Sequence, residues 1–263
     1  MSTSSVDVAE RVHGGFASLD DPAEVFHEAS KLAPSTIGAQ LSGAERLAAD
    51  PELLATTRRA SRTHPQRELV QLPRSLRPPS RLADVVDRRR SRLPEQRRPL
   101  VLRDLATIVQ LAYGARATPL GMRRPVPSAG ALYPLELYVL APDVRGLAPG
   151  IYHYDPYRHS LEALGVLDRA AFDGAWYEPD VAGRAAAVCV LTAVFARTRC
   201  KYDLRGYRFA LLEAGHVAQN ILLAATAVGS AALPYGGAYD RRLDALLGVD
   251  GLHESTVHVV FLG

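Results

Sequence analysis

The most informative stretch of the chain reads Pro127-Ser128-Ala129-Gly130-Ala131-Leu132-Tyr133-Pro134, and it continues directly into the apolar run Leu135-Glu136-Leu137-Tyr138-Val139-Leu140. The apolar run predicts a strand, and the prolines fix the two ends of the loop before it. Ser128 offers a hydroxyl, and Gly130 between alanines lets backbone N–H groups approach a flat or anionic ligand. The segment predicts a cofactor loop that leads into a strand. An ordinary turn before a strand would have a similar composition, so the rest of the chain has to separate the two.

The overall composition indicates a globular protein. The 263 residues are 48% hydrophobic and 22% charged, enough to bury a substantial core. The formal net charge of +3, without a patterned basic face, does not indicate a nucleic-acid-binding protein. Cys189 and Cys200 belong to no CxxC pair and the first residues do not resemble a signal peptide, so we expect no disulfide framework and a cytoplasmic location. Polar side chains interrupt the longest apolar run, Tyr207 to Val228, so we expect a core helix there and no membrane span.

The chain divides into two parts. Residues 1–79 predict a small helical extension, with a helix from Pro22 to Leu32, followed by an extended basic linker rich in proline between His64 and Arg81. Residues 80–263 predict the main domain.

The main domain mixes helices and strands without strict alternation, which favours an α+β fold. The expected elements are a helix capped by Ser80 that carries Leu82, Val85 and Val86, a helix over 102–113 ended by Gly114, a strand over 135–141, a hairpin over 150–154 and 160–164, a strand over 185–195, a helix over 207–228 and a strand over 255–262.

Two groups of arginines are suited to a phosphate. Arg88, Arg89, Arg90 and Arg92 surround Ser91, and guanidinium groups pair bidentately with phosphoryl oxygens. Arg241 and Arg242 follow Gly236-Gly237 and form a second candidate. Solvated surface arginines are the plain alternative in both places. The chain has no GxGxxG after a strand and no P-loop, which disfavours a classical dinucleotide fold and a nucleotide hydrolase.

Lys201 stands out because Lys31 is the only other lysine among the 31 basic side chains. It precedes Tyr202 in a segment between a strand and the long helix, where functional groups are often found. A nearby ammonium would favour the phenolate of Tyr202, and desolvation would oppose it. Neighbouring residues point in different directions, so both side chains can face one pocket only if the backbone there is irregular. A surface lysine beside a half-buried tyrosine is the alternative.

The long helix carries a polar stripe on an otherwise apolar cylinder. Glu213, His216, Gln219 and Asn220 follow helical spacing, and we expect them to line a pocket or a subunit interface rather than solvent. His216 has no companion at metal-ligand spacing, so we propose no metal, and no Ser-His-Asp set can be assigned.

The motifs together resemble the nitroreductase-fold flavoenzymes and, more narrowly, the SagB-type thiazole/oxazole-forming peptide dehydrogenases. The resemblance covers residues 80–263 and rests on the order of Arg89-Arg90-Ser91-Arg92, Pro127 to Glu136, Gly150-Ile151-Tyr152-His153-Tyr154, Arg205-Gly206-Tyr207-Arg208 through Gln219-Asn220, and Gly236-Gly237 to Leu247-Gly248. Phe26 to Leu32 is similar to an N-terminal segment of that family.

The resemblance implies a nitroreductase-like fold, with a mixed, mainly antiparallel sheet flanked by helices, and an FMN-binding homodimer with the flavin in a cleft between subunits. The implied catalytic residues are Lys201 and Tyr202. The implied FMN-binding residues are Arg89, Arg90, Ser91, Arg92, Pro127, Ser128, Ala129, Gly130, Gln219, Asn220, Gly236, Gly237 and Arg241.

The implied activity is the oxidation of thiazolines or oxazolines to azoles in a ribosomally made peptide, after a cyclodehydratase partner has formed the rings. Tyr202, or Lys201 acting through it, would remove a ring proton while the flavin accepts a hydride. Two other functions stay open: a nitro or quinone reductase that uses NAD(P)H, and a non-catalytic, flavin-stabilised scaffold subunit of a cyclodehydratase complex.

Overall fold

The computed structural model describes residues 20–263 except residues 36, 53–56, 58–59 and 120. Its helices are α2 (Pro22–Ala29), α3 (Ile37–Ala49), α5 (Leu82–Arg88), α6 (Leu102–Tyr113), α7 (Arg169–Gly174), α8 (Pro179–Ala182), α9 (Ala196–Val228) and α10 (Asp240–Leu247), with the 3-10 turn η1 (Ala129–Ala131). Its strands are β1 (Leu69–Gln71), β2 (Leu100–Val101), β3 (Arg116–Thr118), β4 (Gly121–Arg123), β5 (Leu135–Ala141), β6 (Val144–Arg145), β7 (Gly150–Asp155), β8 (Ser160–Gly165), β9 (Ala187–Val194), β10 (Ala232–Pro234) and β11 (Glu254–Leu262).

A seven-stranded sheet forms the centre of the molecule, in the order β1-β8-β7-β5-β9-β11-β10. Each neighbouring pair in it is antiparallel. Two small sheets lie outside it: β2 pairs with β6 in parallel, and β3 with β4 as a hairpin. The α+β class and the mainly antiparallel sheet expected from the sequence are confirmed.

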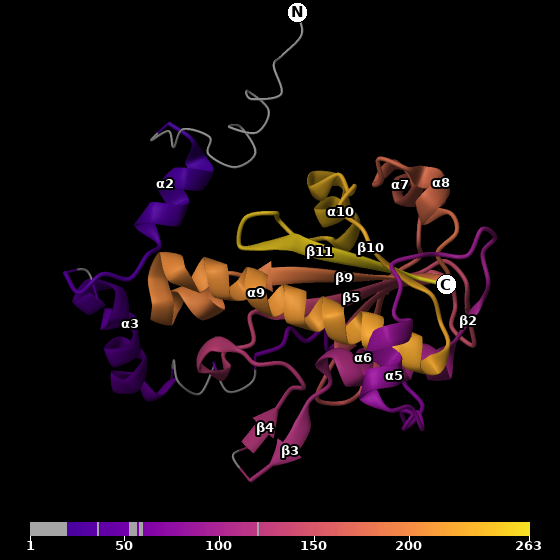
Figure 1. Ribbon diagram of the computed structural model, residues 1–263, viewed down its shortest axis with the longest axis horizontal. Coiled ribbons are helices and arrows are strands. Elements are labelled where there is room, and N and C mark those ends of the chain that lie inside the picture. The colour runs from indigo at the N-terminus through magenta and orange to yellow at the C-terminus, as the bar shows by residue number, and fades with distance from the viewer. Residues whose placement is uncertain (1–19, 36, 53–56, 58–59, 120) are drawn as a thin grey trace, which may run out of the picture.

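One face of the sheet is covered by α6 and α9, and this layer holds the larger apolar core. In α6, Leu105, Ile108, Val109 and Ala112 follow the helical repeat and are fully buried. Each fully buried aliphatic side chain of leucine or isoleucine size contributes roughly 1.5–3 kcal/mol. The helix α9 crosses β5 and β9, with α5 and α6 beside its C-terminal half and α3 beside its N-terminal end (Figure 1).

The helix α9 is the one described helix that is long and apolar enough to cross a membrane by length and composition alone. Residues along its length, among them Ala210, Val217 and Ile221, are buried in the apolar core of the sheet. That burial is typical of the core helix of a globular protein.

The opposite face of the sheet is divided into an apolar half and a polar half. In the apolar half, Phe172 of α7 and Leu243 of α10 belong to one cluster with Trp176 and Phe261. The polar half holds side chains that are all fully or almost fully buried: Glu136, His153, Glu162, Thr192 and Glu254. They share a face because side chains alternate between the two faces of a strand. Glu136 is paired with Thr192 and His153 with Glu162, and Glu254 lies two residues before the partner of Thr192 on β11.

Hydrogen bonds and ion pairs connect these buried groups. His153 contacts Glu162 Oε2 through Nδ1 and Glu136 Oε2 through Nε2, each at 2.9 Å. Thr192 and Tyr138 donate hydrogen bonds to Glu254 Oε1. Burial alone would lower the pKa of His153, but hydrogen bonds to the two glutamates outweigh it and raise the pKa to about 9. The imidazole is therefore a buried cation at neutral pH.

Two further segments attach to this network through the carboxylates. The short stretch 60–64, here called the strap, donates backbone N–H groups of Arg62 to Glu136 and of His64 to Glu162. The Arg62 side chain also forms an ion pair with Glu254 at 2.5 Å. From the start of α9, Arg197 Nη2 reaches Glu136 Oε1 at 2.5 Å. The polar half of the sheet thus holds both the strap and the beginning of α9.

Several expected boundaries agree with the structure. The bounds of α6, its end at Gly114 and the bounds of β5 are confirmed, and so are the hairpin β7–β8 and the final strand within one or two residues. The helix from Pro22 is confirmed, although it ends at Ala29.

Other expectations need correction. The helix α9 begins at Ala196 rather than Tyr207, with a non-helical residue, Asp203, inside it. The N-cap of α5 is Arg81, not Ser80. The segment expected to be an extended linker contains the strand β1, which pairs with β8 at the edge of the sheet. The short strand β10 was not expected either. The domain boundary near residue 80 stays a prediction.

We predict that the free energy of unfolding decreases as the pH rises through about 9. The folded protein raises the pKa of His153 from 6.5 to about 9. Its contribution is therefore complete below pH 6.5 and is lost as the pH rises through the folded value. The expected loss is a few kcal/mol, on the order of 1.4 kcal/mol per pKa unit. Urea unfolding at a series of pH values measures it.

The variant His153→Gln should lack this pH dependence. His253→Gln is the control, because the side chain of His253 is 85% exposed. Equal slopes in the wild type and His153→Gln would contradict the assignment of the buried proton to His153.

Candidate functional site

The loop before β5 has an unusual backbone. Gly130, Ala131 and Tyr133 have φ angles of 63°, 54° and 44°, and the last two are not glycines. A left-handed conformation costs a non-glycine residue roughly 1–2 kcal/mol. Ser128 supports this shape, because its hydroxyl accepts the Tyr133 N–H at 2.9 Å and its carbonyl accepts the Ala131 N–H at 3.0 Å. Two of the four described non-glycine residues with a positive φ thus lie in the loop that the sequence singled out.

The structure brings Lys201 and Tyr202 to this loop. A Cβ built on Gly130 would lie 2.9 Å from the Tyr202 hydroxyl oxygen and 3.1 Å from Lys201 Nζ. Lys201 Nζ also lies 5.3 Å from the centre of the Tyr202 ring. Both polar groups of the pair therefore lie against Gly130, and a side chain at this position would have to displace them. The contact joins the two most distinctive features of the sequence.

An irregular backbone makes this arrangement possible. Asp203, directly after the pair, has φ 48° and ψ −133°, which breaks α9 into a short first part and a long second part. The sequence argument required an irregular backbone for Lys201 and Tyr202 to share a pocket, and that requirement is met.

A buried carboxylic acid lies behind the loop. Glu213 of α9 accepts a hydrogen bond from the Tyr113 hydroxyl at 2.9 Å, and its carboxyl is also hydrogen-bonded to Ser128. Burial raises the pKa of Glu213 to about 7, although the hydrogen bonds with Ser128 and Tyr113 and the charge of Arg124 oppose the shift. Glu213 can therefore exchange a proton near neutral pH, one hydrogen bond away from the strained loop.

The arginines of the run have two different surroundings. Arg89 Nη1 donates to Ser91 Oγ at 3.1 Å, and Ser91 forms a bridge with Ala232 of β10. The other arginines of the run face a cavity of about 890 Å³ between the end of α5, the segment before α6 and the C-terminal end of α9. Its cationic lining residues are Arg88, Arg90, Arg92, Arg97 and Arg98. Below, these residues and their cavity are called the arginine cavity.

The sequence reasoning missed Arg97 and Arg98 in this cavity. They follow the first run after a few residues, and a second basic pair so close to the first was the available signal. Glu95 and Asp104 also line the cavity, so five guanidinium groups face two carboxylates. The balance favours an anionic ligand.

The remaining expected site residues lie outside the arginine cavity. Gly236 and Gly237 follow β10, where the Gly237 carbonyl accepts the Tyr177 N–H at 2.8 Å. Arg241 is exposed in the first turn of α10. Gln219 is exposed and Asn220 half-buried on α9. Their roles at a cofactor stay predictions.

The expected polar stripe on α9 lies partly in the core and partly at the surface of the single chain, and its place in a pocket or a subunit interface stays a prediction. Glu213 is buried, whereas His216 and Gln219 are exposed. The side chains three and six residues after Glu213 are rotated around the helix axis relative to it, so the later residues of the stripe point away from the core.

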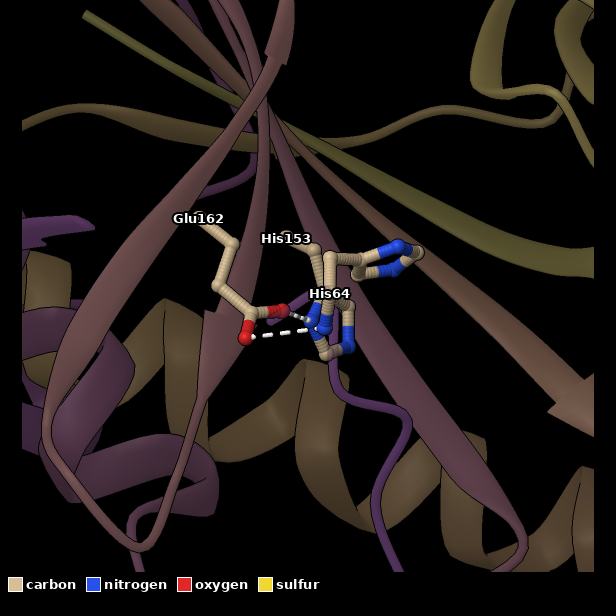
Figure 2. Close-up of side chains that lie close together, drawn as sticks. All are labelled: His64, His153 and Glu162. Atoms are coloured by element: carbon tan, nitrogen blue, oxygen red, sulfur yellow. Dashed lines mark hydrogen bonds and ion pairs between the residues drawn. The ribbon is translucent and has the colours of Figure 1, made fainter. Parts of the chain in front are cut away.

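One cluster has the composition of a metal site. His64, His153 and Glu162 each offer a ligand atom, all within 4.8 Å of one another (Figure 2). Figure 2 shows the Glu162 carboxylate joined to the His153 ring. The other nitrogen of that ring contacts Glu136, so both ring nitrogens of His153 already have a carboxylate partner. A metal ion bound to His153 would have to displace one of these carboxylates. The geometry supports a hydrogen-bonded anchor for the strap.

Comparison with curated proteins identifies relatives along the main domain. MJ1384 of Methanocaldococcus jannaschii, whose name refers to the nitroreductases, is 38% identical over 64% of this chain and 84% of its own. The microcin B17-processing protein McbC of Escherichia coli is 30% identical over 60% of this chain, and the match spans 61% of McbC. The trifolitoxin-processing protein TfxB of Rhizobium leguminosarum is 31% identical over 41% of this chain and only 31% of its own length.

Solved structures share the fold. A nitroreductase-type protein from Anabaena variabilis superposes with a TM-score of 0.68 and 25% identity, covering 91% of this chain and 45% of that one. A chain of the E. coli microcin synthetase McbBCD complex, solved with truncated pro-MccB17 bound, superposes with a TM-score of 0.58 and 21% identity, covering 97% of this chain and 85% of that one.

The sequence pattern of the nitroreductase family matches residues 86–263, which includes the arginine run, the loop, the Lys201–Tyr202 pair and the final strand. The match agrees with the family resemblance expected from the motifs. The chain belongs to the nitroreductase family, whose members are flavin-dependent oxidoreductases.

Proposed function

We propose that this protein is an FMN-dependent dehydrogenase that oxidises thiazolines or oxazolines to azoles in a ribosomally made peptide. The observation that carries the proposal is the convergence of Lys201 Nζ and the Tyr202 hydroxyl on Gly130. An amine and a phenol held at a backbone-lined position suit the removal of a proton from a bound substrate.

The relatives support the peptide substrate. McbC and TfxB are named for the processing of microcin B17 and trifolitoxin, and the McbBCD structure contains a precursor peptide and partner subunits. We extend this to an azoline-containing precursor and a cyclodehydratase partner for the present chain. A cytoplasmic location fits such an assembly.

The residues present fit FMN. The arginine cavity offers guanidinium groups to a phosphate, and Arg90 and Arg92 of the implied phosphate-binding run line it. Gly236 leaves the backbone open to a flat ring system, since a Cβ there would meet nothing within 4 Å. When bound, FMN would supply the acceptor for the two electrons of the oxidation.

The protein's own groups handle the proton and the position of the substrate. Conversion of an azoline to an azole removes two electrons and two protons from the ring. We assign removal of a ring proton to Tyr202, with Lys201 stabilising the phenolate or taking the proton through it. The absence of a side chain at Gly130 lets both groups approach the backbone of the loop closely.

A homodimer is part of the proposal. Leu211 and Leu212 on α9 are 42% and 61% exposed, an unusual arrangement on a helix whose other faces are in the core. A second copy packed against this face would cover them.

A nitro or quinone reductase that draws electrons from NAD(P)H is the second candidate, and the similarity to MJ1384 favours it. Rapid bleaching of the bound flavin by NADPH, with quinone turnover and no action on an azoline peptide, would identify that activity.

The first test uses an azoline-bearing peptide. We expect the FMN-loaded wild type to remove about 2 Da per ring, detected by mass spectrometry. Lys201→Ala and Tyr202→Phe should each lower the rate about 100-fold or more, the range of general acid–base catalysis. Lys31→Ala is the matched control, because Lys31 is the only other lysine. Unchanged azole yield from both variants would remove the catalytic assignment and favour a scaffold role.

The second test addresses the cofactor. Arg90→Gln and Arg92→Gln should weaken FMN binding about 10- to 100-fold, because each removes a charge-assisted hydrogen bond to phosphate. Titration of FMN into the apoprotein, followed by flavin fluorescence, gives the dissociation constants. Arg169→Gln is the control, since Arg169 lies on α7 and forms an ion pair with Asp173. Unaltered affinity in both cavity variants would place the phosphate elsewhere.

A further inference from the structure

The helices before the main domain pack directly on the segment that carries the catalytic pair. The helix α3 lies against the first part of α9 (Figure 1). At the contact, Gly43 is buried, and a Cβ there would overlap the Cys200 carbonyl oxygen and lie 2.8 Å from the Lys201 carbonyl oxygen and 2.9 Å from Lys201 Cα. Backbone therefore meets backbone at the residue before Tyr202, and only glycine allows that approach.

The second part of α9 supports the same segment at another point. A Cβ on Gly206 would lie 2.7–2.8 Å from backbone atoms of Thr198 and Arg199. The Thr198 hydroxyl donates to the Gly206 carbonyl at 2.9 Å. Residues 196–202 are thus held between Gly43 of α3 and Gly206 of α9, and the break at Asp203 lets the chain turn between these contacts.

The motif Arg205-Gly206-Tyr207-Arg208 connects this arrangement to α2. Arg205 donates to the Ser30 carbonyl, and Arg208 to the His27 carbonyl. The Tyr207 ring packs edge-on against Phe26 at 5.3 Å and stacks on Phe195 at 4.5 Å. Each residue of the motif therefore serves a contact with α2 or with the start of α9.

We infer that α2 and α3 are a positioning element for the reaction, and that Gly43 is a positioning residue that sets the place of Lys201 and Tyr202 beside Gly130. The inference rests on the proposed function for its kinetic consequence and on the contacts above for its geometry.

A short helical segment requires such support. A single isolated turn or two of helix is unstable in water, and the φ of 48° at Asp203 adds strain that the surroundings must hold. A displacement of about 1 Å in a catalytic group can cost on the order of 100-fold in rate. The N-terminal helices are thus expected to affect turnover through the pair without touching substrate.

The experiment compares two glycine substitutions in one helix of the full-length, FMN-loaded protein. Gly43→Ala introduces the backbone overlap, whereas Gly38→Ala is the matched control, because a Cβ there meets nothing within 4 Å. Alanine is the better helix former at both positions, so Gly38→Ala should keep or raise the Tm. Gly43→Ala should lower kcat for azoline oxidation about 10- to 100-fold, with KM changed much less.

A second measurement does not depend on activity. The chain has two lysines, so amine labelling followed by site-resolved mass spectrometry reports Lys201 separately from Lys31. Gly43→Ala should change the labelling rate of Lys201, and Gly38→Ala should not. If Gly43→Ala does not fold, Arg208→Gln removes the contact with His27 at the surface and should shift Lys201 labelling in the same way.

The outcomes separate the two proposals. Altered Lys201 labelling in a protein that never oxidises azolines would support the positioning element and reject the proposed function. An active enzyme whose kcat and Lys201 labelling are the same in the wild type, Gly43→Ala and Arg208→Gln would overturn the positioning element.

Discussion

The buried carboxylate of Glu136 is the constraint on which the candidate site depends. It lies two residues after Pro134, which ends the strained loop, in a central strand whose residues are all buried. A buried carboxylate is costly unless cations and N–H donors surround it. Here they come from three directions: His153 on the next strand, Arg62 in the strap and Arg197 at the start of α9. The requirement to neutralise one charge therefore fixes the loop, the strap and the segment before Lys201 in one place.

The strained backbone of the loop is held in place by hydrogen bonds of Ser128, one of which is with Glu213. Two non-glycine residues in the left-handed region favour relaxation of the loop, and the hydrogen bonds of Ser128 to Tyr133 and Glu213 oppose it. Because the pKa of Glu213 is near 7, its protonated and ionised forms are both accessible at neutral pH. The ionised carboxylate can only accept a hydrogen bond from Ser128, whereas the protonated carboxyl can also donate one. The hydrogen bonds of Ser128 thus connect the backbone around Gly130 to the buried carboxyl of Glu213.

The sequence predicted elements whose determinants are local. The helix α6 has a regular apolar repeat and a terminal glycine, and β5 is a short apolar run after a proline, so their bounds could be predicted. The first part of α9 could not, because its many cationic residues resemble a loop and the backbone it packs against, at Gly43, lies more than 150 positions earlier. The same holds for the polar half of the sheet: Glu136, His153 and Glu162 are visible as polar residues in apolar strands, but their partners lie far away in sequence. The Lys201–Tyr202 pair and the loop were identified from motifs, while their contact required the fold.

The spacing of the site along α9 gives a physical reason for the homodimer we propose. The loop is attached to Glu213, whereas the arginine cavity is lined by Thr226 and residues after it. Thirteen residues of helix between Glu213 and Thr226 correspond to about 20 Å at 1.5 Å per residue. A single chain would therefore have to hold a flavin across this separation. A two-fold partner packed on the exposed leucines of α9 could instead bring its own loop toward the cavity of the first copy, so that each flavin is held by phosphate contacts from one chain and ring contacts from both. In that arrangement the exposed apolar face of α9 and the separated halves of the site have one common explanation.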